Sequence, residues 1–149
     1  MSLWLDILRA HNAIVRAELA AHEASWSKSL GDGFLADFPT AIDAVKCAIS
    51  LQRDFVEYND EHPEEPLWLR VGLHTGKAVQ EADDYYGRGV HLAARITGRA
   101  QARGILVSQT LKELTESTRE FTFDEGREVQ LSGVPEPVRV YEVLWREAK

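Results

Sequence analysis

An aspartate between two glycines is the first feature of the sequence that could do chemistry. Gly31, Asp32 and Gly33 stand between apolar residues, in a pattern that predicts the tip of a β-hairpin. A carboxylate held out at such a tip could bind a divalent ion, and the glycines would let a phosphate come close to the backbone. The same residues also fit a plain turn in which Asp and Gly only supply positive φ, so the motif alone leaves both interpretations open.

A second feature is a pair of basic residues four positions apart. His91 and Arg95 share one face of the helix that we expect there. The spacing continues to Arg99 and Arg103, so the same residues also fit an ordinary solvated basic face. The spacing by itself does not separate a binding face from a solvated one.

Lys28 and Asp84 are two further charged residues that, taken singly, are typical of a protein surface. Other chemistry is excluded more firmly. The five histidines lack the spacing of a zinc site, and Cys47 alone can form neither a thiolate cluster nor an internal disulfide. The sequence also lacks a Walker loop and a G-x-S-x-G nucleophile elbow.

The composition is that of an ordinary globular protein, and its 149 residues predict a single domain over residues 1–149. The sequence has 17 Lys and Arg against 24 Asp and Glu, a formal charge of −7. This charge argues against a nucleic-acid partner, because phosphate binding calls for a basic face. No apolar run reaches the roughly 18 residues that a membrane span needs. A lone cysteine and the lack of a secretory pattern at the start favour a cytoplasmic protein.

Hydrophobic periodicity predicts the elements that must position these residues. We expect helices over residues 3–22, 39–58 and 88–101, and a fourth helix that Ser108 caps. Pro39 would occupy the first position of the helix over 39–58. The expected strands are two within 28–38, then 67–74, 77–80, 105–107 and 138–143, with a loop over 83–87 and a turn at 124–126. Helices and hairpins intermix, which favours an α+β fold with a mostly antiparallel sheet covered by helices.

Five short segments, taken in order, carry the most specific pattern. They are Lys28-Ser29-Leu30-Gly31-Asp32-Gly33-Phe34, Val71-Gly72-Leu73-His74-Thr75-Gly76, the run from Asp84 to Ile96, Ile105-Leu106-Val107-Ser108, and Gly133-Val134-Pro135-Glu136-Pro137-Val138. Their order and spacing resemble the class III adenylate/guanylate cyclase catalytic domain, bacterial type, over residues 4–144. The resemblance implies a ferredoxin-like α+β fold and a head-to-tail dimer. It also implies conversion of a nucleoside triphosphate into a 3′,5′-cyclic monophosphate and pyrophosphate, with two divalent ions, Mg²⁺ or Mn²⁺.

The resemblance also implies a role for each candidate residue. Asp32 matches a metal-binding aspartate, and Lys28 and Asp84 match the pair that reads adenine, so ATP is expected rather than GTP. Arg95 matches the arginine that stabilises charge on the α-phosphate in the transition state, and His91 lies at the position that orients the ribose. In such dimers, Asp32 of one chain would serve a site that Lys28, Asp84 and Arg95 of the other chain complete.

Three departures from the family pattern bear on activity. The sequence starts where the family has the helices that follow its first strand. The first strand and the metal-binding aspartate that it carries are therefore absent from this sequence. Asp6 cannot replace that aspartate, because it aligns inside the following helix. Loss of a central strand would leave strand edges unpaired. His91 stands where the family has asparagine, and Ser132 stands where it has a phosphate-binding lysine.

These observations leave three functions open. The first is an adenylate cyclase domain in a homodimer or in a heterodimer with another cyclase domain, with weak or no catalysis by this chain alone. The second is a degenerate module that binds nucleotide or a partner cyclase domain without catalysis. The third is a structural dimerisation domain without a ligand, against which the surviving base-reading pair Lys28 and Asp84 argues.

Overall fold

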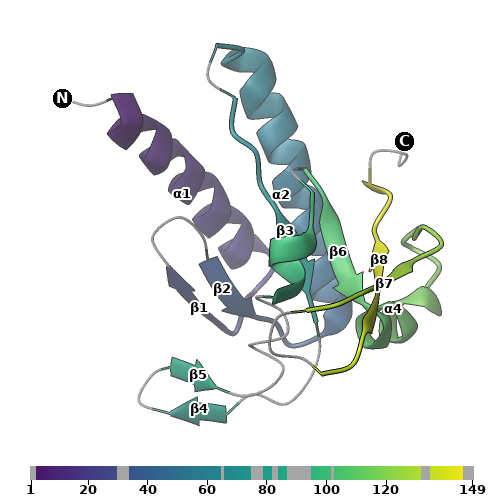
Figure 1. Cartoon of the computed structure of the whole chain (residues 1–149). Coiled ribbons are helices and arrows are strands. Elements are labelled where there is room, and N and C mark those ends of the chain that lie inside the picture. Colours follow the sequence, from purple (N-terminus) through teal and green to yellow (C-terminus); the bar gives the residue numbers. More distant parts are fainter. Residues whose placement is uncertain are drawn as a thin grey trace. The chain divides into compact units, whose positions relative to one another are not determined.

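The computed structural model shows a chain of helices and short strands (Figure 1). It describes residues 3–29, 34–64, 66–74, 79–81, 84–86, 95–101, 103–131 and 135–145. The chain divides into two compact units, Met1–Trp68 and Leu69–Lys149, and each is described by itself.

The first unit consists of two helices and a β-hairpin. Its elements are α1 (Leu3–Ala21), β1 (Trp26–Ser29), β2 (Phe34–Asp37) and α2 (Ala41–Glu61). The strands pair antiparallel from Trp26 with Asp37 to Ser29 with Phe34, as the hairpin pattern predicted. The two helices pack against each other through their apolar faces. The buried residues of this unit are Val15, Leu19, Val45, Cys47, Ala48, Leu51, Gln52 and Phe55.

The junctions around these helices explain where they begin and end. After α1, the Glu23 amide donates to the Ala20 carbonyl and the Ala24 amide donates to the Leu19 carbonyl, while Glu23 adopts φ of 58°. This arrangement is a Schellman motif, which closes a helix through one left-handed residue. At the start of α2, the Thr40 side chain accepts from the Asp43 amide, so Thr40 is the N-cap. Pro39 therefore precedes the cap, and its predicted place inside the helix is wrong.

The second unit is built on a mixed four-stranded sheet in the order β3-β6-β8-β7. Its elements are β3 (Val71–Leu73), β6 (Ile105–Ser108), α4 (Gln109–Glu116), β7 (Arg127–Val129) and β8 (Val138–Glu142). The pair β3–β6 is parallel, and the pairs β6–β8 and β7–β8 are antiparallel. A separate antiparallel hairpin joins β4 (Val79–Glu81) to β5 (Asp84–Tyr86). The predicted α+β class with a mostly antiparallel sheet is confirmed.

A helical segment over residues 95–99 lies on the core of this sheet. Ile96 is fully buried there and packs in one apolar cluster with residues of β6, β7 and β8. The cluster consists of Ile96, Ala100, Leu106, Val129, Leu131 and Val140. Residues 88–94 of the predicted helix 88–101 lie outside the described residues.

Two predicted elements differ from the structure in ways that matter below. Of the strand expected over 67–74, Val71–Leu73 pairs with β6, and the Leu69 carbonyl before it accepts from the Arg103 amide over 2.9 Å. Asp84, expected in a loop, instead begins β5 and pairs with Glu81. Period-two alternation marks residues that can form a strand, but a partner strand decides how much of the run joins the ladder.

In the described part of the chain, β2 and β3 are among the strands that pair on one side alone. There, β2 pairs with β1 alone and β3 pairs with β6 alone. Val71 and Leu73 in β3 are only half-buried, whereas the four residues of β6 are buried.

Candidate functional site

The predicted site residues fall on three described elements and on two segments outside the description. Lys28 belongs to β1 and Asp84 to β5, and Arg95 begins the helical segment 95–99. Asp32 and His91 lie outside the described residues. Lys28 belongs to the first unit and the other two described residues to the second, so the base-reading pair stays a prediction.

Arg95 is held in place by a close contact between its helical segment and β3. A Cβ added to Gly72 in the middle of β3 would lie 2.4 Å from the backbone nitrogen of Thr97, so only glycine fits there. Ile96, next to Arg95, is buried in the core and turns the neighbouring side chain outward. The result is an exposed guanidinium on a segment fixed from two sides.

The neighbouring arginines do different work. Arg99, four residues after Arg95, donates from Nη1 to the Gln130 carbonyl over 3.0 Å and so ties the segment to the end of β7. Arg103 lies beyond the helical segment, in a turn where its φ is 70°. The spacing suggested one basic helix face from His91 through Arg95 and Arg99 to Arg103, and Arg103 does not belong to that face. Arg95 is exposed, and a guanidinium of this kind can bind a phosphate through two parallel hydrogen bonds.

A histidine and a serine form a second polar contact at the ends of adjacent strands. His74 follows β3, and its Nδ1 lies 2.7 Å from Oγ of Ser108, the last residue of β6. The same Ser108 oxygen accepts from the Leu111 amide over 3.2 Å and caps α4, as predicted. One hydroxyl thus joins the end of β3 to the start of α4, because it can donate to the ring while it accepts from the backbone.

The sequence analysis did not find the pair of His74 and Ser108. Burial of the His74 ring lowers its pKa, so the neutral form is favoured, and this suits a ring that accepts from a hydroxyl. The missing signal was strand register: Leu73 pairs with Val107 in parallel, so the residues that follow them are neighbours. Sequence periodicity shows each strand but not which strands lie side by side.

Metal ligands were tested against the described side chains. The described part of the chain holds no group of three or more His, Cys, Asp or Glu that could bind a metal ion. The one carboxylate assigned to a metal, Asp32, lies outside the described residues. The divalent ion therefore stays a prediction that depends on Asp32.

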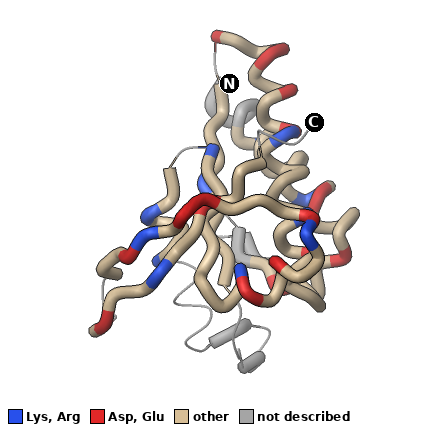
Figure 2. The backbone as a smooth tube through the Cα atoms, turned by 90° about the vertical axis from the view of Figure 1, so that its right-hand side faces the viewer, with Lys and Arg blue, Asp and Glu red and all other residues tan. Residues whose placement is uncertain are grey.

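Two further observations concern the charge and the hydropathy of the described residues. Acidic residues gather at the C-terminal end of α2 and in the loop that follows it (Figure 2). Their negative charge would repel a polyanion at this end of the helix. Among the described helices, none is long and apolar enough to cross a bilayer.

Comparison with known proteins defines the class. The profile of the adenylate and guanylate cyclase catalytic domain matches residues 2–144. The chain therefore belongs to the adenylate and guanylate cyclase catalytic domain family, as the order of its motifs suggested.

Curated relatives agree with this family. The chain is 30% identical over 142 residues to a protein of Rhizobium meliloti described as a putative adenylate cyclase 3, and this match covers 95% of the chain and 23% of the relative. It is 30% identical over 146 residues to an adenylate cyclase of Mycosarcoma maydis, covering 80% of the chain and 6% of the relative. The chain thus spans less than a quarter of the length of either relative.

Solved structures show the same fold. An adenylate/guanylate cyclase/hydrolase from Silicibacter pomeroyi superposes with a TM-score of 0.83 at 25% identity, over 95% of this chain and 86% of that one. An adenylate cyclase from Trypanosoma brucei, described in its monomeric state, gives a TM-score of 0.84 at 23% identity, over 99% and 83%. The predicted nucleotide cyclase fold is confirmed.

Proposed function

We propose that this chain is an adenylate cyclase domain that converts ATP to 3′,5′-cyclic AMP and pyrophosphate within a dimer. The observation that carries the proposal is the placement of Arg95. Its guanidinium is exposed on a segment fixed by Gly72 and Ile96. The match to a cyclase family over residues 2–144 supports a role for that guanidinium in binding a phosphate of the substrate.

The reaction closes a ring between the ribose and the α-phosphate of one ATP molecule. The 3′-oxygen of the ribose attacks the α-phosphorus, the bond from that phosphorus to the bridging oxygen breaks, and pyrophosphate leaves while the 3′-hydroxyl loses its proton. Negative charge grows on the α-phosphate oxygens during this step. A fixed guanidinium stabilises that charge more in the transition state than in bound ATP, which is what accelerates a reaction.

The base-reading pair favours ATP in this proposal. An ammonium at Lys28 can donate to a ring nitrogen of adenine, and a carboxylate at Asp84 can accept from its amino group. Guanine presents the opposite pattern at those positions. Two relatives described as adenylate cyclases support the same choice.

The divalent ion and the dimer complete the proposal. Mg²⁺ or Mn²⁺ bound with Asp32 would supply charge neutralisation for the phosphates. The partner is either a second copy of this chain or another cyclase domain, and it would bring Asp32 to a site formed by the first chain's Lys28, Asp84 and Arg95.

A second function, nucleotide binding without turnover, is favoured by two residues. His91 replaces an asparagine and Ser132 replaces a lysine of the family pattern, and a hydroxyl cannot neutralise the charge of leaving pyrophosphate. Weak turnover by this chain alone agrees with the same two residues.

The deciding experiment measures binding and turnover on one preparation. The chain is titrated with Mn²⁺–ATP in a calorimeter and then assayed for cyclic AMP, with GTP and cyclic GMP as the comparison. We expect ATP binding that Lys28→Ala weakens at least tenfold, and cyclic AMP formation that Arg95→Ala slows by about 10²–10³-fold. Binding without product supports the second function. No heat with ATP or GTP contradicts both functions.

A further inference from the structure

The turn that follows the helical segment 95–99 contains a residue in an uncommon backbone conformation. Arg103 has φ of 70°, in the left-handed region that residues other than glycine adopt at a cost in free energy. It lies between the segment that begins with Arg95 and the strand β6. A strained residue of this kind persists where the surrounding structure fixes it, so the contacts of Arg103 identify what holds the turn.

Both backbone groups of Arg103 are hydrogen-bonded to parts of the chain that are distant in sequence. Its amide donates to the Leu69 carbonyl, just before β3, over 2.9 Å. Its carbonyl accepts from Nε1 of Trp145, beyond the end of β8, over 3.0 Å. Trp145 is 7% exposed, so its indole is packed inside the second unit. We call the contact of Arg103 with Leu69 and Trp145 the Trp145 clamp.

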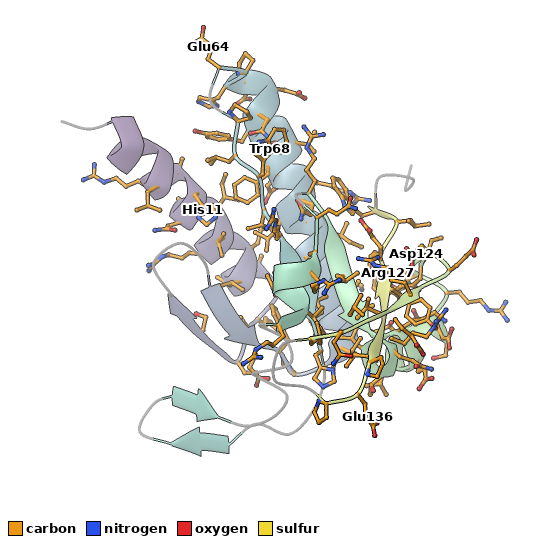
Figure 3. The ribbon with its side chains drawn as sticks, viewed as in Figure 1. His11, Glu64, Trp68, Asp124, Arg127 and Glu136 are labelled. Atoms are coloured by element: carbon orange, nitrogen blue, oxygen red, sulfur yellow. The ribbon has the colours of Figure 1, made fainter. Side chains whose placement is uncertain are left out.

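The end of β8, from which Trp145 extends, is itself held in the sheet. The Val143 amide donates to the Ile105 carbonyl over 2.9 Å and joins the end of β8 to the start of β6. Oδ1 of Asp124, which is labelled in Figure 3, accepts from the Glu142 amide over 2.9 Å. Trp145 therefore reaches the turn from a fixed part of the sheet.

The strand that follows the turn is fixed as well. β6 pairs with β3 on one side and with β8 on the other, and its four residues are buried. A Cβ on Gly104 would lie 2.9 Å from the Gln101 carbonyl oxygen and 3.3 Å from Oε2 of Glu142, so the chain is closely packed where it enters β6. A relaxation at Arg103 is therefore taken up on the other side of the turn, by the segment 95–99, whose residues are mostly exposed.

We propose that Trp145 is a positioning residue for Arg95 and acts through the strained turn at Arg103. Its indole N–H holds the Arg103 carbonyl and keeps the turn in its left-handed form. The clamp thereby fixes the end of the Arg95 segment, as Gly72 fixes its middle. This inference rests on the proposed function, in which Arg95 stabilises charge on the α-phosphate, and it adds a residue that acts on the reaction through Arg95.

Trp145→Phe removes the N–H donor and keeps an aromatic ring in its place. Because Arg95 acts in the transition state, a displaced segment is expected to lower kcat by about 10- to 100-fold. The KM for ATP is expected to stay within about twofold, since an interaction made only in the transition state does not contribute to it. The matched control is Trp68→Phe. Trp68 lies in the chain that runs back along α2 (Figure 3), is 47% exposed, and is expected to leave both constants unchanged.

Arg103→Gly separates positioning from a general loss of stability. Glycine adopts a φ of this sign without strain, so the turn keeps its form with less dependence on the clamp. In the Trp145→Phe chain, Arg103→Gly is expected to raise kcat at least about threefold, and alone it should leave kcat near the wild-type value. If Trp145 served stability alone, the added glycine would restore nothing, because it also makes the unfolded chain more flexible.

Amide hydrogen exchange reports the turn without any need for turnover. The amides of Arg103 and Gly104 donate to the carbonyls of Leu69 and Gln101 over 2.9 Å and 2.8 Å. Trp145→Phe is expected to speed the exchange of both amides roughly tenfold, because the turn then opens more often. Trp68→Phe should leave their exchange unchanged.

The two measurements separate the possible outcomes. Exchange that Trp145→Phe leaves unchanged overturns the clamp. Faster exchange with an unchanged kcat, or no recovery of kcat with Arg103→Gly, overturns the positioning of Arg95 by Trp145. A wild-type chain that forms no cyclic AMP contradicts the proposed function instead, and the exchange of the Arg103 and Gly104 amides then decides whether the clamp holds the turn.

Discussion

Gly72 and Thr97 approach so closely that a methyl group on Gly72 would lie 2.4 Å from the Thr97 backbone nitrogen. The contact sets the segment that begins with Arg95 directly on β3. We expect Gly72→Ala to displace this segment and to lower the free energy of unfolding by about 1–3 kcal/mol, the usual cost of overpacking. Denaturant unfolding measures the stability, and the cyclic AMP assay reports the displacement of Arg95.

Gly98 provides the matched control for this prediction. A Cβ at Gly98 would meet nothing within 4 Å, and the residue lies in the same helical segment. Gly98→Ala is expected to be neutral or to stabilise by about 0.5–1 kcal/mol, because alanine favours helix. Equal destabilisation by both substitutions would mean that the Gly72 contact does not hold the segment.

Arg95 and Arg99 allow a similar comparison for catalysis. In the preparation that forms cyclic AMP, Arg95→Ala is expected to lower kcat by about 10²–10³-fold, the typical cost of losing one transition-state donor. Arg95→Lys should restore little, because an ammonium cannot form a bidentate contact with phosphate. Arg99→Ala is expected to leave kcat within about threefold, since Arg99 contacts the Gln130 carbonyl. An Arg95→Ala chain with unchanged kcat would remove the main support for the cyclase proposal.

Ser108 and Thr40 are both helix N-caps, but only Ser108 also contacts a histidine. Thr40→Ala is expected to cost about 1 kcal/mol of stability, as for an exposed cap. Ser108→Ala should cost about 2–3 kcal/mol, because it removes a cap and leaves the half-buried Nδ1 of His74 without its partner. Chemical denaturation of the two variants measures the difference, and equal losses would show that the contact with His74 contributes nothing.

The pH dependence of stability is expected to have opposite signs in the two units. The pKa of His74 is lowered in the folded chain, so its contribution is fully present above the unfolded pKa of about 6.5 and is lost as the pH falls. The pKa of Asp54 is raised to about 7, so its contribution is fully present below the ordinary value of 3.8 and is lost as the pH rises toward 7. His74→Gln should therefore flatten the acid side of the stability profile, and Asp54→Asn the neutral side.

Unfolding titrations at several pH values between 4 and 8 measure both effects. A His74→Gln chain with the same acid-side slope as wild type would assign that slope to other groups. Because the two residues lie in different units and share no partner among the described contacts, we expect their effects to add.

Local rules predicted most of the elements, and long-range pairing accounts for what they missed. The helix over 3–22, the antiparallel pairing of Trp26–Ser29 with Phe34–Asp37 and the cap at Ser108 each depend on nearby residues, and all three are confirmed. The strand expected over 67–74 is shorter in the structure because Val71–Leu73 is the described part that pairs with β6, and Asp84 belongs to a strand through pairing with Glu81.

The residues of the candidate site were predictable from the sequence, but the contacts that position them were not. Its residue types came from a family resemblance, because a single arginine or lysine carries no signal of its own. The reason for glycine at position 72 lies in its contact with Thr97, and the contact of the Cys47 thiol with the Glu18 carbonyl joins two helices. Such contacts depend on tertiary packing, which no spacing along the chain reveals.

Glu23 carries a backbone cost that one substitution can remove. It adopts φ of 58° as the left-handed residue of the motif that ends α1, a conformation that glycine adopts without strain. Glu23→Gly is therefore expected to raise the free energy of unfolding by about 0.5–1 kcal/mol, despite the greater flexibility of the unfolded chain. The matched control is Glu57→Gly inside α2, where glycine should instead cost about 1 kcal/mol. Thermal and denaturant unfolding measure both, and a loss of stability in both variants would mean that the Glu23 side chain contributes more than its backbone costs.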